Sequence, residues 1–251
     1  MNRSLKVRGT QWAVLGAAGI GLEVIPRLGV GDAITFSPLS AIVARGWELV
    51  ISGELNTHLM ATGGALVISF ALAAIAGVPL GWLLWRLPRL KRVLDPYLTA
   101  YYAIPIFAFY PVLLTILGFN LWPIITIAWA WSVVAVLLNS AIGFATVPDV
   151  LIKVGKSLSL SRRQVFTRIV LHAAGPYVFT GLKLGVVYAL IGVIASEFVL
   201  STRGLGYLVS NNYVNFQTTD MYVAMYMVLA LGALLNLGLT SLERRLYGHR
   251  T

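Results

Sequence analysis

The sequence of 251 residues has no cysteine, three histidines and only nine acidic residues. The lack of cysteine excludes disulfides, thiol catalysis and metal sites built on thiolates. His58, His172 and His249 lie far apart, and no pair has the spacing of metal ligands. We therefore expect no metal site in this chain.

Charge of either sign is also scarce. Charged residues make up 11% of the chain and hydrophobic residues 58%, whereas a soluble domain carries roughly 25% charged residues. The long apolar runs do not alternate polar with apolar residues, which excludes barrel strands. Because a spanning helix needs about 20 mostly apolar residues, the fold class is predicted to be all-α, a polytopic membrane protein formed by one domain over 1–251. Six spans are predicted, near 12–30, 58–85, 97–118, 121–143, 175–199 and 221–241.

The few cations are sorted by loop. With the N-terminus inside, fifteen of the 19 Lys and Arg residues fall on one side of the predicted membrane. The positive-inside rule therefore places both termini in the cytoplasm. The net charge of +10 is explained by these boundary cations and their contacts with lipid headgroups, not by nucleic acid. The inner cations are Arg3, Lys6, Arg8, Arg86, Arg89, Lys91, Arg92, Lys153, Lys156, Arg162, Arg163, Arg168, Arg244, Arg245 and Arg250, whereas Arg27, Arg45 and Arg203 lie outside and Lys183 lies within a span.

Catalytic motifs are missing. Gly155-Lys156-Ser157 resembles the end of a phosphate-binding loop, but the required earlier glycine is replaced by Val150. The serines within the spans lack the Gly-x-Ser-x-Gly context of a nucleophile. We expect no catalytic residue, no nucleotide site and no enzymatic activity in this chain.

Two segments outside the spans have helical patterns. Ser37 to Val50, in the outer segment 31–57, has the spacing of a helix that lies in the membrane interface. The cytoplasmic connection 144–174 also has helical apolar spacing, with Pro148-Asp149 as its predicted start and Pro176 as the start of the fifth span. A loop of about 30 residues in a compact protein usually has a function.

Small residues within the spans predict close helix packing. Gly77 with Gly81, and Gly181 with Gly185, have the small-xxx-small spacing that lets helix backbones approach in lipid. Prolines in or at spans indicate helix breaks that neighbouring helices or a cavity must satisfy. These prolines are Pro79, Pro105, Pro111 and Pro123.

Four polar residues within the spans are candidates for a pathway or gate. Glu197 is either functional or an interface residue paired with a cation such as Arg203. Lys183 is either a pathway residue or a side chain that extends to the cytoplasmic headgroups. Ser132 and Asn139 are expected mainly as hydrogen-bond partners between helices.

The motifs together resemble the permease subunit of type I ABC importers, in the branch that handles sulfonates, taurine and nitrate. The resemblance covers nearly the whole chain. Its motifs are Ala103-Ile104-Pro105 with Tyr110-Pro111 and Gly118, Phe179 to Leu184, and Ser196-Glu197-Phe198 followed by Arg203 to Leu208.

These permeases share a cytoplasmic motif of Glu-Ala-Ala, three residues, Gly, nine residues and Ile-x-Leu-Pro. Ile169 to His172 match its tail, which places Ser159 at the glycine and Lys153-Val154-Gly155 at Glu-Ala-Ala. The three departures, to Lys, Ser and His, raise the alternative that this chain pairs with a different permease that carries the intact motif. The resemblance assigns ATPase coupling to Lys153, Val154, Gly155, Lys156, Ser157, Leu158, Ser159, Leu160 and Ser161.

The resemblance implies import by alternating access. The expected partners are two cytoplasmic ATPase subunits, a second permease (identical or different) and an external substrate-binding protein. The chain itself is expected to bind no cofactor, with ATP and Mg on the ATPase partners. The substrate is expected to be a small organic or inorganic anion, and the location is the plasma (inner) membrane of a prokaryote. A passive channel, or a scaffold or regulatory subunit that does not transport, is the alternative.

Overall fold

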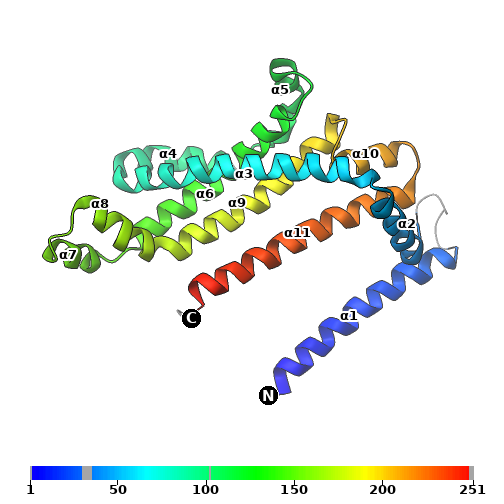
Figure 1. Ribbon diagram of the computed structural model, residues 1–251, viewed down its shortest axis with the longest axis horizontal. Coiled ribbons are helices and arrows are strands. Elements are labelled where there is room, and N and C mark those ends of the chain that lie inside the picture. The colour runs from blue at the N-terminus through cyan, green and yellow to red at the C-terminus, as the bar shows by residue number, and fades with distance from the viewer. Residues whose placement is uncertain (1, 30–35, 102, 249–251) are drawn as a thin grey trace.

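A computed structural model describes residues 2–29, 36–101 and 103–248, and every regular element within them is a helix (Figure 1). Residues 31–35 of the predicted outer segment, and His249 and Arg250 near the C-terminus, lie outside the described residues. The elements are α1 (Asn2–Arg27), α2 (Leu39–Ser52), α3 (Glu54–Arg86), α4 (Pro88–Tyr101), the 3-10 helix η1 (Ile106–Phe109), α5 (Tyr110–Leu117), α6 (Trp122–Ala145), α7 (Asp149–Ser157), α8 (Arg162–Gln164), the π-helical segment η2 (Val165–Val170), α9 (Leu171–Leu200), α10 (Leu205–Val214) and α11 (Thr218–Tyr247).

The core is built around α6, which packs along both α3 and α9. A Cβ added at Gly77 or Gly81 of α3 would lie 2.8 Å from Val136 Cβ or 2.6 Å from the Leu137 carbonyl oxygen of α6. On α9, a Cβ at Gly181 or Gly185 would come equally close to α6. Both small-xxx-small pairs therefore lie at helix contacts, as predicted, and α6 is the most enclosed of the long apolar helices.

Four helices are long and apolar enough to cross a membrane, judged by length and composition over the described residues. They are α3, α6, α11 and the continuous helix that runs from Arg162 to Val199. These correspond to the predicted spans 58–85, 121–143, 221–241 and 175–199. α1 is not among them, so the predicted six spans, with 12–30 as the first, are not confirmed. Pro176 lies inside α9 and does not mark its start, because α8, η2 and α9 follow one another without a break.

The predicted third span, 97–118, is not one straight helix. α4 ends at Tyr101, and η1 and α5 follow after a bend of 80°. Pro105 precedes η1 and Pro111 lies in the first turn of α5. A proline lacks the N–H that a continuous helix needs, so the chain breaks here. Counting this bent pair as one span raises the total from four to five.

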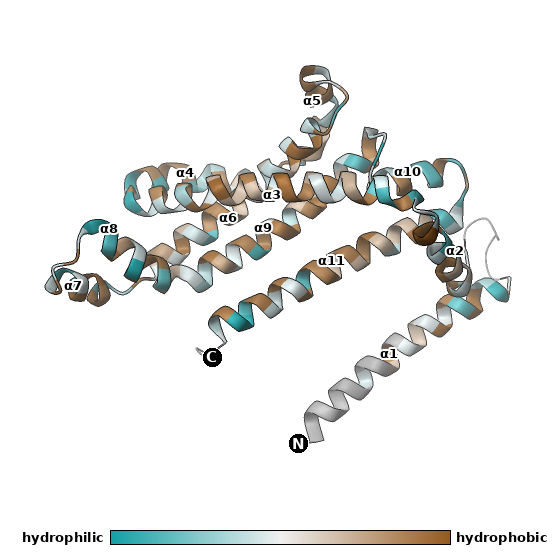
Figure 2. Cartoon of the chain, viewed as in Figure 1, coloured by the Kyte–Doolittle hydropathy of each residue, from teal (hydrophilic) through white to brown (hydrophobic). Residues whose placement is uncertain are grey.

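Different elements lie at the two ends of the long helices. In Figure 1 the N-terminus of α1 and the C-terminus of α11 lie toward the same end of the long helices as α7 and α8. α2 and α10 lie at the opposite end. Figure 2 shows hydrophilic residues on α8 and at the end of α11, whereas the middles of α3, α6 and α9 are mostly hydrophobic. α2 confirms the helix predicted between Ser37 and Val50.

Candidate functional site

A buried carboxylate joins three helices at the end opposite α7 and α8, which the predicted topology places outside. Glu197, near the end of α9, is 1% exposed. Thr62 of α3 lies with its hydroxyl oxygen 2.9 Å from both carboxylate oxygens and donates to them. The same hydroxyl accepts the N–H of Leu205 at 2.9 Å, and the N–H of Gly206 donates to Glu197 at 2.9 Å. We call Glu197, Thr62, Leu205 and Gly206 the Glu197 network.

The Glu197 network satisfies N–H groups at the start of α10. The first N–H groups of a helix have no partner within it, and a carboxylate is favourable there because of the helix dipole. Gly204, just before α10, has φ of 115°, a conformation that side chains rarely adopt. A Cβ at Gly204 would overlap the Glu197 carboxylate. The turn from α9 into α10 is therefore held closely against Glu197.

His58 strengthens the same turn. Its Nδ1 accepts the N–H of Gly204 at 3.2 Å, and its ring stacks on Tyr207 with 5.9 Å between centroids. Glu197 thus contacts Thr62 and backbone N–H groups. If Glu197 were an interface residue, Arg203 was the expected partner. No hydrogen bond or ion pair joins Arg203 to Glu197 in the described residues. Sequence reasoning did not find Thr62, and it considered His58 only as a metal ligand, because neither residue lies near Glu197 in the sequence.

The other three pathway candidates lie apart from the Glu197 network. Ser132 donates to the Gly185 carbonyl at 2.7 Å and joins α6 to α9, as expected. Asn139 donates to Ala135 within its own helix at 2.9 Å, so its described bond does not join two helices. Lys183 pairs with Glu243 of α11 at 3.1 Å, a partner that the sequence did not indicate. The structure does not bring these four residues together.

At the opposite end, α7 presents an apolar and basic face. Pro148 precedes the helix and Asp149 begins it, as predicted. Val154 and Leu158 are exposed, the latter by 66%, and Lys153 and Lys156 are exposed beside them. Gly155 is buried against η2, and an added Cβ there would lie only 2.7 Å from the end of the Ile169 side chain. α7 therefore rests on η2 through its glycine side and leaves the other side open.

The turn after α7 is tightly defined. Ser159 has φ of 53°, in the left-handed region, which explains why a glycine is expected at this position of the motif. Ser161 accepts the N–H of Gln164, and the Gln164 side chain accepts the N–H of Ser161 in return. This reciprocal capping starts α8. Of the remaining coupling candidates, Ser157 is exposed and Leu160 is half-buried.

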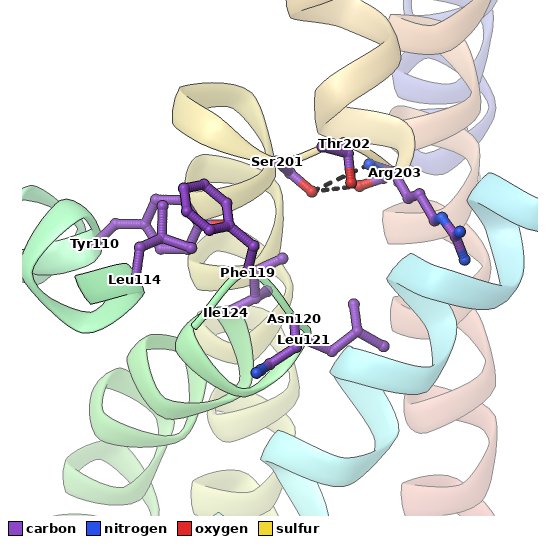
Figure 3. A pocket seen from close by; sticks show the side chains of 9 residues that line it. All are labelled: Tyr110, Leu114, Phe119, Asn120, Leu121, Ile124, Ser201, Thr202 and Arg203. Atoms are coloured by element: carbon purple, nitrogen blue, oxygen red, sulfur yellow. Dashed lines mark hydrogen bonds between the residues drawn. The ribbon is translucent and has the colours of Figure 1, made fainter. Parts of the chain in front are cut away.

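A pocket of about 320 Å³ lies between two turns (Figure 3), and we call it the outer pocket because the predicted topology places it outside. The turn from α5 to α6 supplies Phe119, Asn120 and Leu121, and the turn from α9 to α10 supplies Ser201, Thr202 and Arg203. Its apolar wall is completed by Tyr110, Leu114 and Ile124. In the described residues no group of three or more His, Asp or Glu residues is arranged to hold a metal ion.

Comparison with protein families decides the identity. Residues 59–248 match the model of the binding-protein-dependent transport system inner membrane component. The chain belongs to this family. The match includes the Glu197 network, α7 and the outer pocket. Permeases of this family are transport proteins of the inner membrane and are typically not catalytic.

Several curated relatives are transport permeases with a named substrate. The chain is 31% identical over 197 residues to the taurine transport system permease protein TauC of Escherichia coli (strain K12), covering 78% of this chain and 71% of that protein. It is 31% identical over 186 residues to the bicarbonate transport system permease protein CmpB of Synechocystis sp., covering 74% and 66%. It is 28% identical to the putative aliphatic sulfonates transport permease protein SsuC of Bacillus subtilis, covering 89% and 81%.

The fold agrees with a solved transporter. An inward-facing structure of the MetNI methionine ABC transporter matches with a TM-score of 0.66 at 17% identity, covering 76% of this chain and 95% of the other. The similarity confirms the predicted all-α permease fold.

Proposed function

We propose that this chain lines the pathway of an ATP-driven importer for a small anion and that α7 is its coupling helix. The observation that carries the proposal is the open face of α7. Leu158 and Val154 are exposed apolar residues, with the exposed Lys153 and Lys156 beside them. An exposed apolar group rimmed by charges marks a protein contact. ATPase subunits are the partners that this family requires.

The proposed complex has ATPase subunits on the cytoplasmic side and a binding protein outside. ATP and Mg bind to the ATPase subunits, whose closure moves α7 and the helices attached to it as rigid elements. A second permease completes the pathway. The membrane is the plasma (inner) membrane of a prokaryote, which the bacterial relatives support.

An anionic substrate is proposed from the relatives. Taurine, bicarbonate and aliphatic sulfonate permeases are all similar to this chain. All three substrates carry an oxyanion head. The described spans offer few cations to bind such a head, since Lys183 is paired with Glu243. The cation must therefore come from an end of the helices.

The test is affinity purification of the tagged chain, expressed with its native neighbouring genes, and mass spectrometry of the intact complex. We expect an ATPase dimer and two permease chains. The number of distinct permeases distinguishes a homodimer from a heterodimer. Recovery of this chain alone, at good yield in mild detergent, would contradict the importer and favour a channel or a scaffold.

A further inference from the structure

Arg203 carries an uncompensated charge at the outer end. Arg27 pairs with Glu23, and Arg45 pairs with Asp220 at 2.8 Å and with Glu48 at 3.2 Å. In the part of the chain that the structure describes, no carboxylate forms an ion pair with Arg203. Of the three outer arginines, Arg203 alone offers a free guanidinium in these residues.

That guanidinium belongs to the outer pocket. Figure 3 shows the turn from α9 to α10 facing the turn from α5 to α6 across it. The Thr202 hydroxyl has no hydrogen-bond partner among the described contacts, and one Asn120 N–H donates to the Leu117 carbonyl, which leaves its second N–H free. Arg203 and Thr202 on the turn from α9 to α10 therefore carry donors without described acceptors, and Asn120 adds one N–H from the facing turn; an anion requires such donors.

Apart from Asn120, the facing wall is apolar. Leu114 and Ile124 are buried, and Phe119 and Leu121 of the turn from α5 to α6 are exposed beside them. A volume of about 320 Å³ lies at the small end of the range for ligand pockets, roughly 300–1,000 Å³. The pocket thus offers a cation and donors on one side and aliphatic contacts on the other. This combination fits an anionic head with a short carbon chain better than a bare inorganic ion.

The site is held in place before a ligand arrives. Arg203 directly precedes Gly204, which His58 and Glu197 fix, and Ser201 closes the turn by donating to the Arg203 carbonyl at 2.7 Å. A fixed backbone reduces the entropy cost of ligand binding. The Glu197 network therefore positions Arg203 without lining the pocket itself.

We propose that the outer pocket is a receiving site for a short-chain organic oxyanion, such as an alkyl sulfonate, whose charged head binds Arg203. The anion occupies it after release from the binding protein and before it enters the pathway. Arginine suits this role because its planar fork binds a tetrahedral or planar oxyanion through two parallel hydrogen bonds. The proposal rests on the importer function and names its substrate class.

The test is direct binding of radiolabelled ethanesulfonate to the complete complex in phosphatidylcholine nanodiscs, without the binding protein. We expect Arg203→Gln to weaken binding about tenfold or more, because a charge-assisted pair is lost. Arg203→Lys should bind with intermediate affinity. Arg27→Gln is the matched control, since it removes an outer arginine that is already paired with Glu23, and it should bind as the wild type does.

Two results would overturn the proposal. One is a wild-type complex that binds no ethanesulfonate, and the other is unchanged ethanesulfonate affinity in Arg203→Gln. Loss of binding-protein docking in the second case would make Arg203 a protein contact. The importer function is judged separately by whether ATPase subunits copurify, so failure of the site and failure of the function are distinguishable.

Discussion

The hydroxyl of Thr62 lies 2.9 Å from both carboxylate oxygens of Glu197, although 135 positions separate the two residues in the sequence. This contact joins α3 to α9, and through the N–H groups of Leu205 and Gly206 it also fixes the start of α10. The geometry favours a positioning role for Glu197. A gate residue would need access to the pathway, whereas this carboxylate is enclosed.

We expect Glu197→Gln and Thr62→Val each to destabilise the complex by about 2 kcal/mol, because each leaves a buried hydrogen-bonding group without its partner. The double variant should lose less than the sum, since both changes disrupt one network. Thermal unfolding followed by fluorescence-detected size-exclusion chromatography measures this. Ser69→Ala, also buried on α3 but bonded only within its helix, is the control. Normal stability with altered uptake in Glu197→Gln would instead assign it to the pathway.

Gly204 should tolerate no side chain. Gly204→Ala forces a Cβ into the Glu197 carboxylate and places alanine at a positive φ. We expect a loss of about 3 kcal/mol or more, seen as a large fall in the yield of assembled complex. Gly63→Ala is the matched control, because no described atom lies within 4 Å of its added Cβ. Equal yields of the two variants would refute the close packing described for this turn.

Local patterns in the sequence predicted the local structure well. Apolar runs located α3, α6, α9 and α11, and the glycine pairs located the contacts of α3 and α9 with α6. The predicted span 97–118 is a bent pair of helices with its break between Tyr101 and Ile106, which an average of hydropathy does not register although Pro105 indicated it. Pro176, predicted as the start of the fifth span, lies inside α9, because the helix begins before the predicted span does.

The partners of the polar residues were not predictable from the sequence. Lys183 was expected either in the pathway or extended to headgroups, yet it meets Glu243, 60 positions away. Asn139 and Ser132 looked alike in the sequence, but only Ser132 has a described bond to another helix. Such pairs depend on the rotation of each helix about its axis. Hydrophobic periodicity predicts which face of a helix is buried, but it does not predict which residue of a neighbouring helix that face contacts.

Leu158 tests the coupling role of α7. Leu158→Glu places a charge on the exposed apolar face that we assign to the ATPase contact, so we expect loss of ATP-driven uptake and of copurified ATPase with normal membrane insertion. Leu158→Met keeps the apolar contact and should retain both. Uptake measured in proteoliposomes, beside quantification of the inserted chain, decides the outcome. Normal uptake by Leu158→Glu would remove the coupling assignment.

Ser159 tests the backbone of the same segment. A residue other than glycine at φ 53° carries a steric cost of about 1 kcal/mol, which glycine relieves and a β-branched residue increases. We therefore expect Ser159→Gly to slow amide exchange in the peptides over 149–165 by about fivefold and Ser159→Val to speed it by a similar factor. Hydrogen exchange with mass spectrometry on the assembled complex measures both variants under one condition. Equal protection in the two would mean that the left-handed turn is not maintained when the ATPase is bound, and the rigid transmission of motion through α7 would then lose its structural basis.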